Sequence, residues 1–272
     1  MAKSGHIYLG IDVGSVSVNT VVMNQNRDIL EEHYTRTMGQ PLKAVRKVLT
    51  EVLSCIEKGQ IMTASLTGTA GKLVAELIGA NFVNEIIAQS KSVEHLYPQV
   101  KTIVEIGGED SKLILLDYDT HQKRVRIADF AMNTICAAGT GSFLDQQAHR
   151  LGLSIEEFSK LALKSENPPR IAGRCSVFAK TDMIHLQQGA APDFDIVAGL
   201  CYAMARNFKS NIGKGKKFTR PVSFQGGGSS QCGHEKGILR CLRIRGSGVC
   251  HSRGFCINGR HRFCDCYYGR PG

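Results

Sequence analysis

The chain has 272 residues, 42% of them hydrophobic and 21% charged, which is enough for one large domain or two modest lobes with a buried core. No apolar run approaches the roughly 20 residues of a membrane span, and no signal-peptide pattern is present, so we expect a cytoplasmic protein without a membrane contact. The formal net charge is +10, but residues from Gly228 onward hold eight Lys/Arg against two Asp/Glu. The residues before Gly228 therefore have a net charge of only +4, which disfavours a nucleic-acid partner.

The first third of the chain predicts an α/β unit. The breaks between its first strands fall at Gly14-Ser15 and Asn24-Gln25-Asn26, which are turn-forming residues. The apolar periodicity predicts three strands, a helix, a strand and a second helix, over residues 7–12, 17–24, 28–36, 41–59, 61–68 and 71–79. The segment 81–97 continues in the same α/β manner.

The same order of elements recurs from residue 100. Residues 100–132 predict strand, glycine turn, strand, turn and strand. The elements that follow are helices over 141–153, 154–165, 175–189 and 194–212 and a strand over 221–228. Two copies of a βββαβ pattern indicate two related lobes, which we assign to residues 1–97 and 98–227.

Both halves place a glycine turn and acidic residues after their first strand, in "IDVGSVS" and in "VEIGGEDS". A glycine there lets backbone N–H groups approach phosphate oxygens, and nearby carboxylates can hold Mg²⁺ and orient a water. One such turn also fits an ordinary hairpin, whereas two facing turns are what a nucleotide between two lobes requires. The pattern is not a P-loop, because no G-x-x-x-x-G-K-[ST] occurs. The candidates are Asp12, Gly14, Ser15 and Ser17 in the first half and Gly107, Gly108, Glu109 and Asp110 in the second.

Four cysteines precede residue 232, and two of them stand just before helical patterns. Cys136 lies in "NTICAAGTGSFL", and Cys175 opens "CSVFAKTDMIHLQQG". Each is either a small residue in a tight loop or a cofactor ligand at a helix start, where free N–H groups favour a thiolate. We interpret Cys55 and Cys201 as core residues, because a free cysteine packs as a small hydrophobic group.

The segments "GIDVGSVSVN", "EIGGEDSK", "NTICAAGTGSFL", "RCSVFAKTDMIHLQQG" and "PVSFQGG" carry a family resemblance. Over residues 6–227 the chain resembles the ATPase family of 2-hydroxyacyl-CoA dehydratase activators and benzoyl-CoA reductase ATP-binding subunits. That family belongs to the acetate kinase/sugar kinase/heat-shock protein 70/actin superfamily. One departure is Asn19, where the family's first phosphate motif often has lysine.

The resemblance implies a two-lobed, actin-like α/β fold with duplicated ribonuclease H-like lobes. It implies catalytic roles for Asp12, Glu109 and Asp110, with ATP and Mg²⁺ as ligands. The cofactor-binding positions that match the family's motifs are Val13, Gly14, Ser15, Val16, Ser17, Gly107, Gly108, Ser111, Gly139, Gly141, Gly226 and Gly227.

The resemblance also implies that Cys136 and Cys175 are ligands of a [4Fe–4S] cluster. A four-iron cluster needs four protein ligands, so two chains would share one cluster in a homodimer. The implied function is ATP-dependent transfer of one electron, received from a ferredoxin or flavodoxin, to a 2-hydroxyacyl-CoA dehydratase or benzoyl-CoA reductase component. A small-molecule kinase is the alternative within the superfamily, and a basic nucleic-acid-binding protein is the alternative outside it.

Residues 228–272 depart from the family, which has a helix-forming end there. The stretch is rich in cysteine, glycine and arginine, has no steady period, and lacks the paired cysteines of a zinc module. Codons exist for "GSSQCGHEKGI" and "HSRGFCINGRHR" that, read one base later, give V-A-A-N-V-G-M-K-R-A and I-P-E-A-F-A-S-M-G-A-I-G, which resemble family motifs. We therefore interpret 228–272 as an out-of-frame, poorly packed tail that follows one extra base in a run of G.

Overall fold

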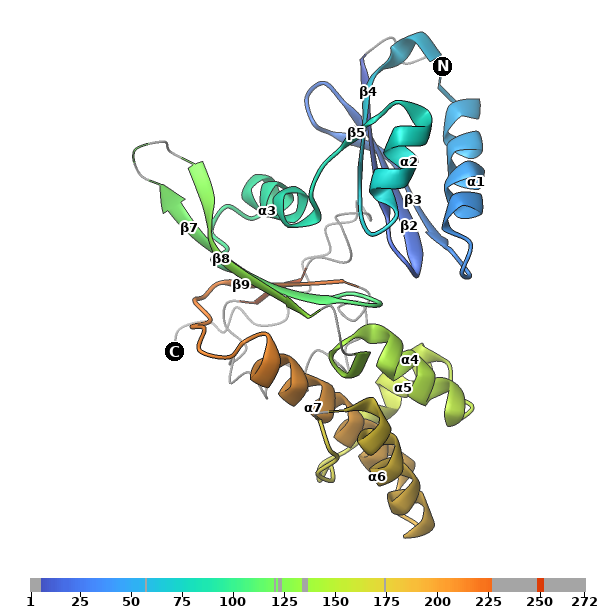
Figure 1. The fold of residues 1–272 in the computed structure, drawn as a ribbon, viewed down its shortest axis with the longest axis vertical. Helices are drawn as coiled ribbons and strands as arrows, with labels where there is room; N and C mark the ends of the chain where they lie inside the picture. The colour runs from blue at the N-terminus through green and yellow to red at the C-terminus, as the bar shows by residue number, and fades with distance from the viewer. Residues whose placement is uncertain are drawn as a thin grey trace, which may run out of the picture. The chain divides into compact units, whose positions relative to one another are not determined.

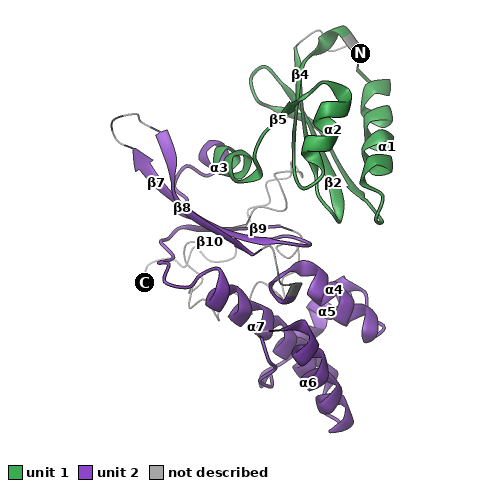
Figure 2. Cartoon of the chain, in the orientation of Figure 1, with its two compact units in different colours: residues 1–92, 255–262 green, residues 93–254, 263–272 purple. Residues whose placement is uncertain are grey.

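The computed structural model of the chain describes residues 6–56, 58–119, 121, 124–133, 137–173, 175–226 and 249–251. The chain forms two compact units that divide between Ser92 and Val93, within helix α3 (Glu85–Leu96), as Figure 2 shows. The predicted boundary at 97/98 lies just beyond the end of this helix and stays a prediction.

Unit 1, before the division, is built on a five-stranded sheet with the order β3-β2-β1-β4-β5. The central strand β1 runs antiparallel to β2 and parallel to β4, and β2 is antiparallel to β3. The strands are β1 (Ile7–Val13), β2 (Ser17–Asn24), β3 (Ile29–Arg36), β4 (Ile61–Thr67) and β5 (Asn81–Phe82). The predicted strands of this half are therefore present.

Helices α1 (Pro41–Ser54) and α2 (Gly71–Ile78) lie on one face of this sheet (Figure 1). The buried stripe of α1, which ends at Val52, belongs to the same hydrophobic cluster as Leu9 and Ile11 of β1. α1 ends before Gly59, the predicted end of this helix. Residues 53–55 are exposed, so they bury no apolar surface that would stabilise another helical turn. A short 3₁₀ turn, η1 (Lys58–Gln60), leads into β4.

Unit 2 repeats the sheet of unit 1, with the order β10-β9-β6-β7-β8. Its central strand β6 is antiparallel to β7 and parallel to β9, as β1 is to β2 and β4. The strands are β6 (Thr102–Ile106), β7 (Ser111–Asp119), β8 (Arg124–Asn133), β9 (Val222–Gln225) and β10 (Val249–His251). The prediction of two related α/β lobes is confirmed by this shared topology.

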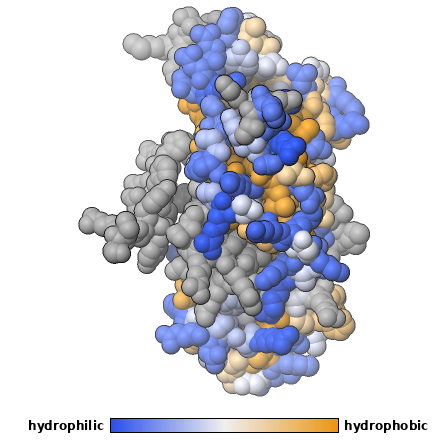
Figure 3. Space-filling model, turned by 90° about the vertical axis from the view of Figure 1, so that its left-hand side faces the viewer, coloured by the Kyte–Doolittle hydropathy of each residue, from blue (hydrophilic) through white to orange (hydrophobic). Residues whose placement is uncertain are grey.

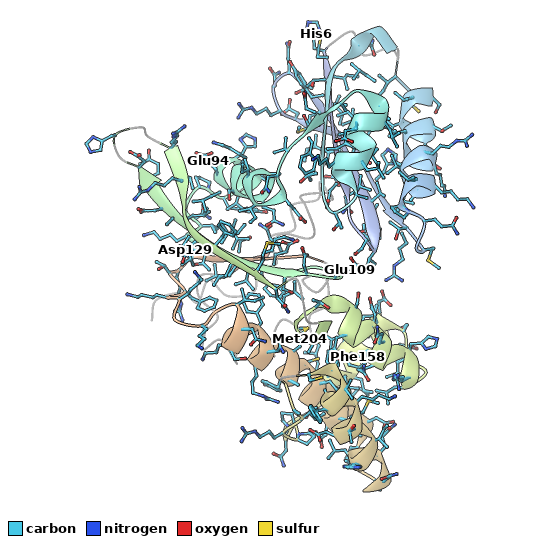
Figure 4. All side chains as sticks on the ribbon, in the orientation of Figure 1. His6, Glu94, Glu109, Asp129, Phe158 and Met204 are labelled. Atoms are coloured by element: carbon cyan, nitrogen blue, oxygen red, sulfur yellow. The ribbon has the colours of Figure 1, made fainter. Side chains whose placement is uncertain are left out.

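Helices α4 (Gly141–Arg150), α5 (Ile155–Ala162), α6 (Ser176–Gln188) and α7 (Asp193–Asn211) lie on one side of the second sheet (Figure 1). α7 is buried along most of its length and shares one hydrophobic cluster with the sheet and the other helices. Phe158 of α5 and Met204 of α7, labelled in Figure 4, belong to this cluster.

The start of α5 carries a capping box. The Ser154 hydroxyl accepts the N–H of Glu157, and the Glu157 carboxylate accepts the N–H of Ser154 at 2.8 Å. The hydrogen bond from the Ser154 N–H lowers the pKa of Glu157, because it stabilises the ionised carboxylate.

The surface drawn in Figure 3 carries hydrophobic patches among hydrophilic ones. The exposed apolar side chains include Leu73 and Leu77 on α2 and Val177 and Phe178 on α6. Among the described helices, none is both long and apolar enough to cross a membrane.

Candidate functional site

The glycine turn of unit 1 joins β1 to β2 and is fixed from outside by β3. The Gly14 N–H donates to the carbonyl of Ser17 at 3.0 Å, which closes the turn. Thr37, directly after β3, donates through its hydroxyl to the Ser15 carbonyl at 2.5 Å and through its N–H to the Val16 carbonyl at 2.9 Å. The backbone conformation of the predicted phosphate turn is thus set by three hydrogen bonds.

Asp12 lies in a row of polar side chains that crosses three strands. On β2 its register partner is Asn19, and on β4 its register partner is Thr67. The Asn19 amide donates to Asp12 Oδ2 at 3.1 Å, so the residue that departs from the family's lysine holds the carboxylate through a neutral group. Thr67 is 5% exposed, and its hydroxyl has no hydrogen-bond partner in the part of the chain that the structure describes.

Gly68, which the sequence analysis did not identify, lies close against Asp12. Its φ is +90°, and a Cβ built there would lie 2.5 Å from Asp12 Oδ1 and 2.6 Å from the Val13 carbonyl oxygen. The Ala70 N–H donates to the same Val13 carbonyl at 3.0 Å. The available signal was "TGTAG", a glycine-rich segment directly after a strand parallel to β1.

The turn of unit 2 closes with the same hydrogen bond as the turn of unit 1. The Gly107 N–H donates to the Asp110 carbonyl at 2.9 Å, and a Cβ on Gly107 would lie 2.9 Å from that oxygen. Glu109, labelled in Figure 4, is exposed on this turn. The two predicted turns are therefore alike in hydrogen bonding as well as in sequence.

A buried lysine, which the sequence analysis did not single out, holds two carboxylates beside this turn. Lys112 is 1% exposed, and its Nζ lies 3.0 Å from Asp110 Oδ1 and 3.1 Å from Glu105 Oε2. The pairs keep a buried ammonium ion compensated. Glu105 and Asp110 thus carry the ion pairs of Lys112, while Glu109 lies exposed on the neighbouring turn.

The turn of unit 2 is bonded directly to the segment that follows position 136. The N–H groups of Gly141 and Ser142, at the start of α4, donate to the carbonyls of Gly107 and Gly108 at 2.8 and 3.0 Å. The Ser111 hydroxyl donates to the Gly139 carbonyl at 2.7 Å. Five predicted cofactor-binding residues are brought together in this way, namely Gly107, Gly108, Ser111, Gly139 and Gly141.

Gly226 directly follows β9 and lies beside the end of β6. Its φ is +93°, and a Cβ there would lie 2.3 Å from the Ile106 carbonyl oxygen, so no other residue fits without a shift of backbone. Two other predicted residues, Gly227 and Cys136, lie outside the described residues.

Cys175 is the residue that caps the start of α6. It has extended backbone angles, φ −146° and ψ 136°, its thiol makes no capping bond, and it is a half-buried free cysteine. Its own carbonyl accepts the Ala179 N–H at 3.0 Å. The structure therefore places Cys175 at a helix start, as the sequence predicted.

The other two described cysteines differ from each other. Cys201 on α7 is buried as predicted, and burial raises the pKa of its thiol well above the usual range. Cys55 is exposed just after α1, so its prediction as a core residue is wrong, because the helix ends before it can turn this residue inward. Within the described ranges, no three His, Cys, Asp or Glu side chains are grouped so that they could hold a metal ion.

Residues 9–242 match the model of the BadF/BadG/BcrA/BcrD ATPase family. A 2-hydroxyisocaproyl-CoA dehydratase activator of Clostridioides difficile is 28% identical over 75% of this chain and 74% of its own length. The (R)-2-hydroxyglutaryl-CoA dehydratase activating ATPase of Acidaminococcus fermentans is 29% identical over 72% of this chain and 74% of its own length. A solved structure of the activator of the 2-hydroxyisocaproyl-CoA dehydratase from Clostridium difficile, with bound ADPNP, is also similar. It has a TM-score of 0.78 and 25% sequence identity, and the match covers 92% of this chain and 90% of that chain.

We predict that Gly68→Ala destabilises the chain. The new Cβ would collide with Asp12 and Val13 at a positive φ, so we expect a loss of about 1–3 kcal/mol in the free energy of unfolding, measured by urea titration. Gly10→Ala is the matched control. Gly10 lies on β1, two residues before Asp12 and on the same face of the strand, and a Cβ there meets nothing within 4 Å. Equal stability of the two variants would contradict the assigned contact.

Proposed function

The chain belongs to the BadF/BadG/BcrA/BcrD ATPase family, and on that premise we propose that it is an ATP-hydrolysing activator of a CoA-ester dehydratase or reductase. In this proposal the protein couples ATP hydrolysis to the transfer of one electron to that enzyme. The observation that carries the proposal is the pair of backbone hydrogen bonds between the Gly107-Gly108 turn and the start of α4. These bonds join a phosphate-binding type of turn to the segment that follows Cys136.

For the nucleotide, each unit supplies one glycine turn and its own carboxylates. We assign the turns to the phosphates, through backbone N–H groups, and Asp12, Glu109 and Asp110 to Mg²⁺ and to the attacking water. Asp12 is suited to accept a hydrogen bond from that water, because Asn19 and the Gly68 backbone hold its carboxylate in one orientation. Hydrolysis then gives ADP and inorganic phosphate.

For the electron, the proposed group is one [4Fe–4S] cluster shared by two chains through Cys136 and Cys175. Cys175 fits a ligand role, because it is free, half-buried and placed at the start of α6. When bound, such a cluster supplies a reversible one-electron couple at low potential. The chain's own part is to hold the two thiolates and to limit their contact with water.

The partners follow from the same assignment. A ferredoxin or flavodoxin would deliver the electron, and a 2-hydroxyacyl-CoA dehydratase or benzoyl-CoA reductase component would receive it. The relatives support an enzyme of this class as partner, because two of them are a dehydratase activator and an activating ATPase.

We predict that Asp12→Asn reduces ATP hydrolysis at least about tenfold, because the neutral amide attracts Mg²⁺ less strongly and is a weaker hydrogen-bond acceptor for the water than a carboxylate. Phosphate release measures the effect. The matched control is Asp28→Asn, an exposed carboxylate in the β2–β3 turn whose loss should leave the rate unchanged. A normal rate in the Asp12 variant would refute its assignment.

We predict about four irons per two chains in protein prepared without oxygen, and loss of this iron in Cys175→Ala. Cys55→Ala is the control, because Cys55 is an exposed thiol outside the proposed site. Iron content and visible absorption give the readout. A full complement of iron in a monomer, or in the Cys175 variant, would overturn the shared-cluster assignment.

We further propose that residues 228–272 are translated out of frame. The composition of this stretch and its shifted-frame matches support the proposal. Within the stretch, the structure describes Val249–His251, which form strand β10. Deleting one base from the G run at Gly227 should then give a product that is more soluble and binds ATP more tightly than the 272-residue chain. Tight ATP binding by the present chain, with a tail that resists protease, would contradict the proposal.

A further inference from the structure

One buried amide on α7, that of Asn207, meets both segments that flank the proposed ligand cysteines. Asn207 is 1% exposed, and its Nδ2 donates to the Gly173 carbonyl at 2.6 Å, two residues before Cys175. Its Oδ1 faces Gly139, where a Cβ would lie only 2.7 Å from that oxygen. The same side chain therefore contacts the backbone on both sides.

The segment before Cys175 is seated closely on α7. A Cβ on Gly173 would lie 2.6 Å from the Ala203 carbonyl oxygen, so this segment approaches the helix backbone directly. The Arg206 guanidinium donates to the Ile171 carbonyl at 2.5 Å. A shift of α7 or of Asn207 must therefore be passed on to the start of α6.

The other side of Asn207 leads to the nucleotide turn. Gly139, which Asn207 contacts, accepts the hydrogen bond of Ser111, the residue that follows the 107–110 turn. The backbone bonds from the start of α4 to Gly107 and Gly108 lie in the same cluster. A continuous series of short contacts thus joins the turn to Cys175 through one side chain.

We propose that Asn207 is a positioning residue that transmits a nucleotide-dependent change of the 107–110 turn to Cys175. The inference rests on the proposed function, since it requires a nucleotide at this turn. A buried amide that donates to one segment and packs closely against the other is costly to displace from either, so it moves with both. Packed networks of this kind respond to a small displacement by adopting a second arrangement.

The test measures how a nucleotide changes the reactivity of the Cys175 thiol in the full 272-residue chain without added iron or sulfide. The alkylation rate by iodoacetamide is followed by mass spectrometry of the Cys175 peptide, with and without Mg·ADPNP. Exposed Cys55 serves as an internal standard, and buried Cys201 should stay unreactive because burial raises its pKa. We expect ADPNP to change the Cys175 rate at least about fivefold, relative to Cys55.

In Asn207→Ala we expect this ratio to fall below about twofold while ADPNP still binds. Asn207→Asp keeps the shape and an oxygen but lacks the donor to Gly173, and it should lose the response as well, so it serves if the alanine variant does not fold. Asn211→Ala is the matched control. It removes the 3.1 Å bond from Asn211 to Asn207 Oδ1 without touching either cysteine segment, and it should respond as the wild type does.

The outcomes separate the inference from the function on which it rests. ADPNP binding without any change at Cys175 in the wild type, or an unchanged response in both Asn207 variants, would overturn the role of Asn207 alone. Failure to bind ADPNP, measured by calorimetry both for this chain and for the product with one base deleted from the G run, would instead overturn the nucleotide assignment, and the role of Asn207 with it.

Discussion

The two hydrogen bonds from the start of α4 to the carbonyls of Gly107 and Gly108 are the constraint on which the rest of unit 2 depends. The first N–H groups of a helix need partners, and here a glycine turn supplies them. A Cβ on Gly141 would lie 3.1 Å from the Gly107 carbonyl oxygen, so a larger residue would force the helix start and the turn apart. One local requirement thus brings the glycine turn of unit 2 and the start of α4 together.

Helix α7 is the support against which these segments are held. Its buried side chains belong to the main hydrophobic cluster of unit 2, and its small residues admit the backbone of the segment before Cys175. Asn207 adds directional bonds to that packing. Apolar burial provides the stability, whereas the hydrogen bond of the amide fixes the Gly173 segment on α7, because hydrogen bonds are directional and hydrophobic contacts are not.

The two units hold their carboxylates by different means. In unit 1 the neutral Asn19 amide orients Asp12, with Thr67 in the same row, and in unit 2 the buried Lys112 ammonium pairs with Asp110 and Glu105. An ammonium ion adds charge–charge attraction to its hydrogen bonds, whereas a neutral amide contributes only a hydrogen bond. The duplicated topology therefore carries two distinct electrostatic environments.

The sequence by itself determined the local features: the strands, the glycine turns, the helices, and the place of Cys175 at a helix start. These depend on periodicity and turn chemistry within a few residues. Only the tertiary structure decided that Gly68 lies under Asp12, that Lys112 is buried between carboxylates, that Cys55 is exposed, and that Asn207 joins two segments. Such contacts join residues that are distant in sequence or depend on where a helix ends, and no local pattern encodes which of them meet.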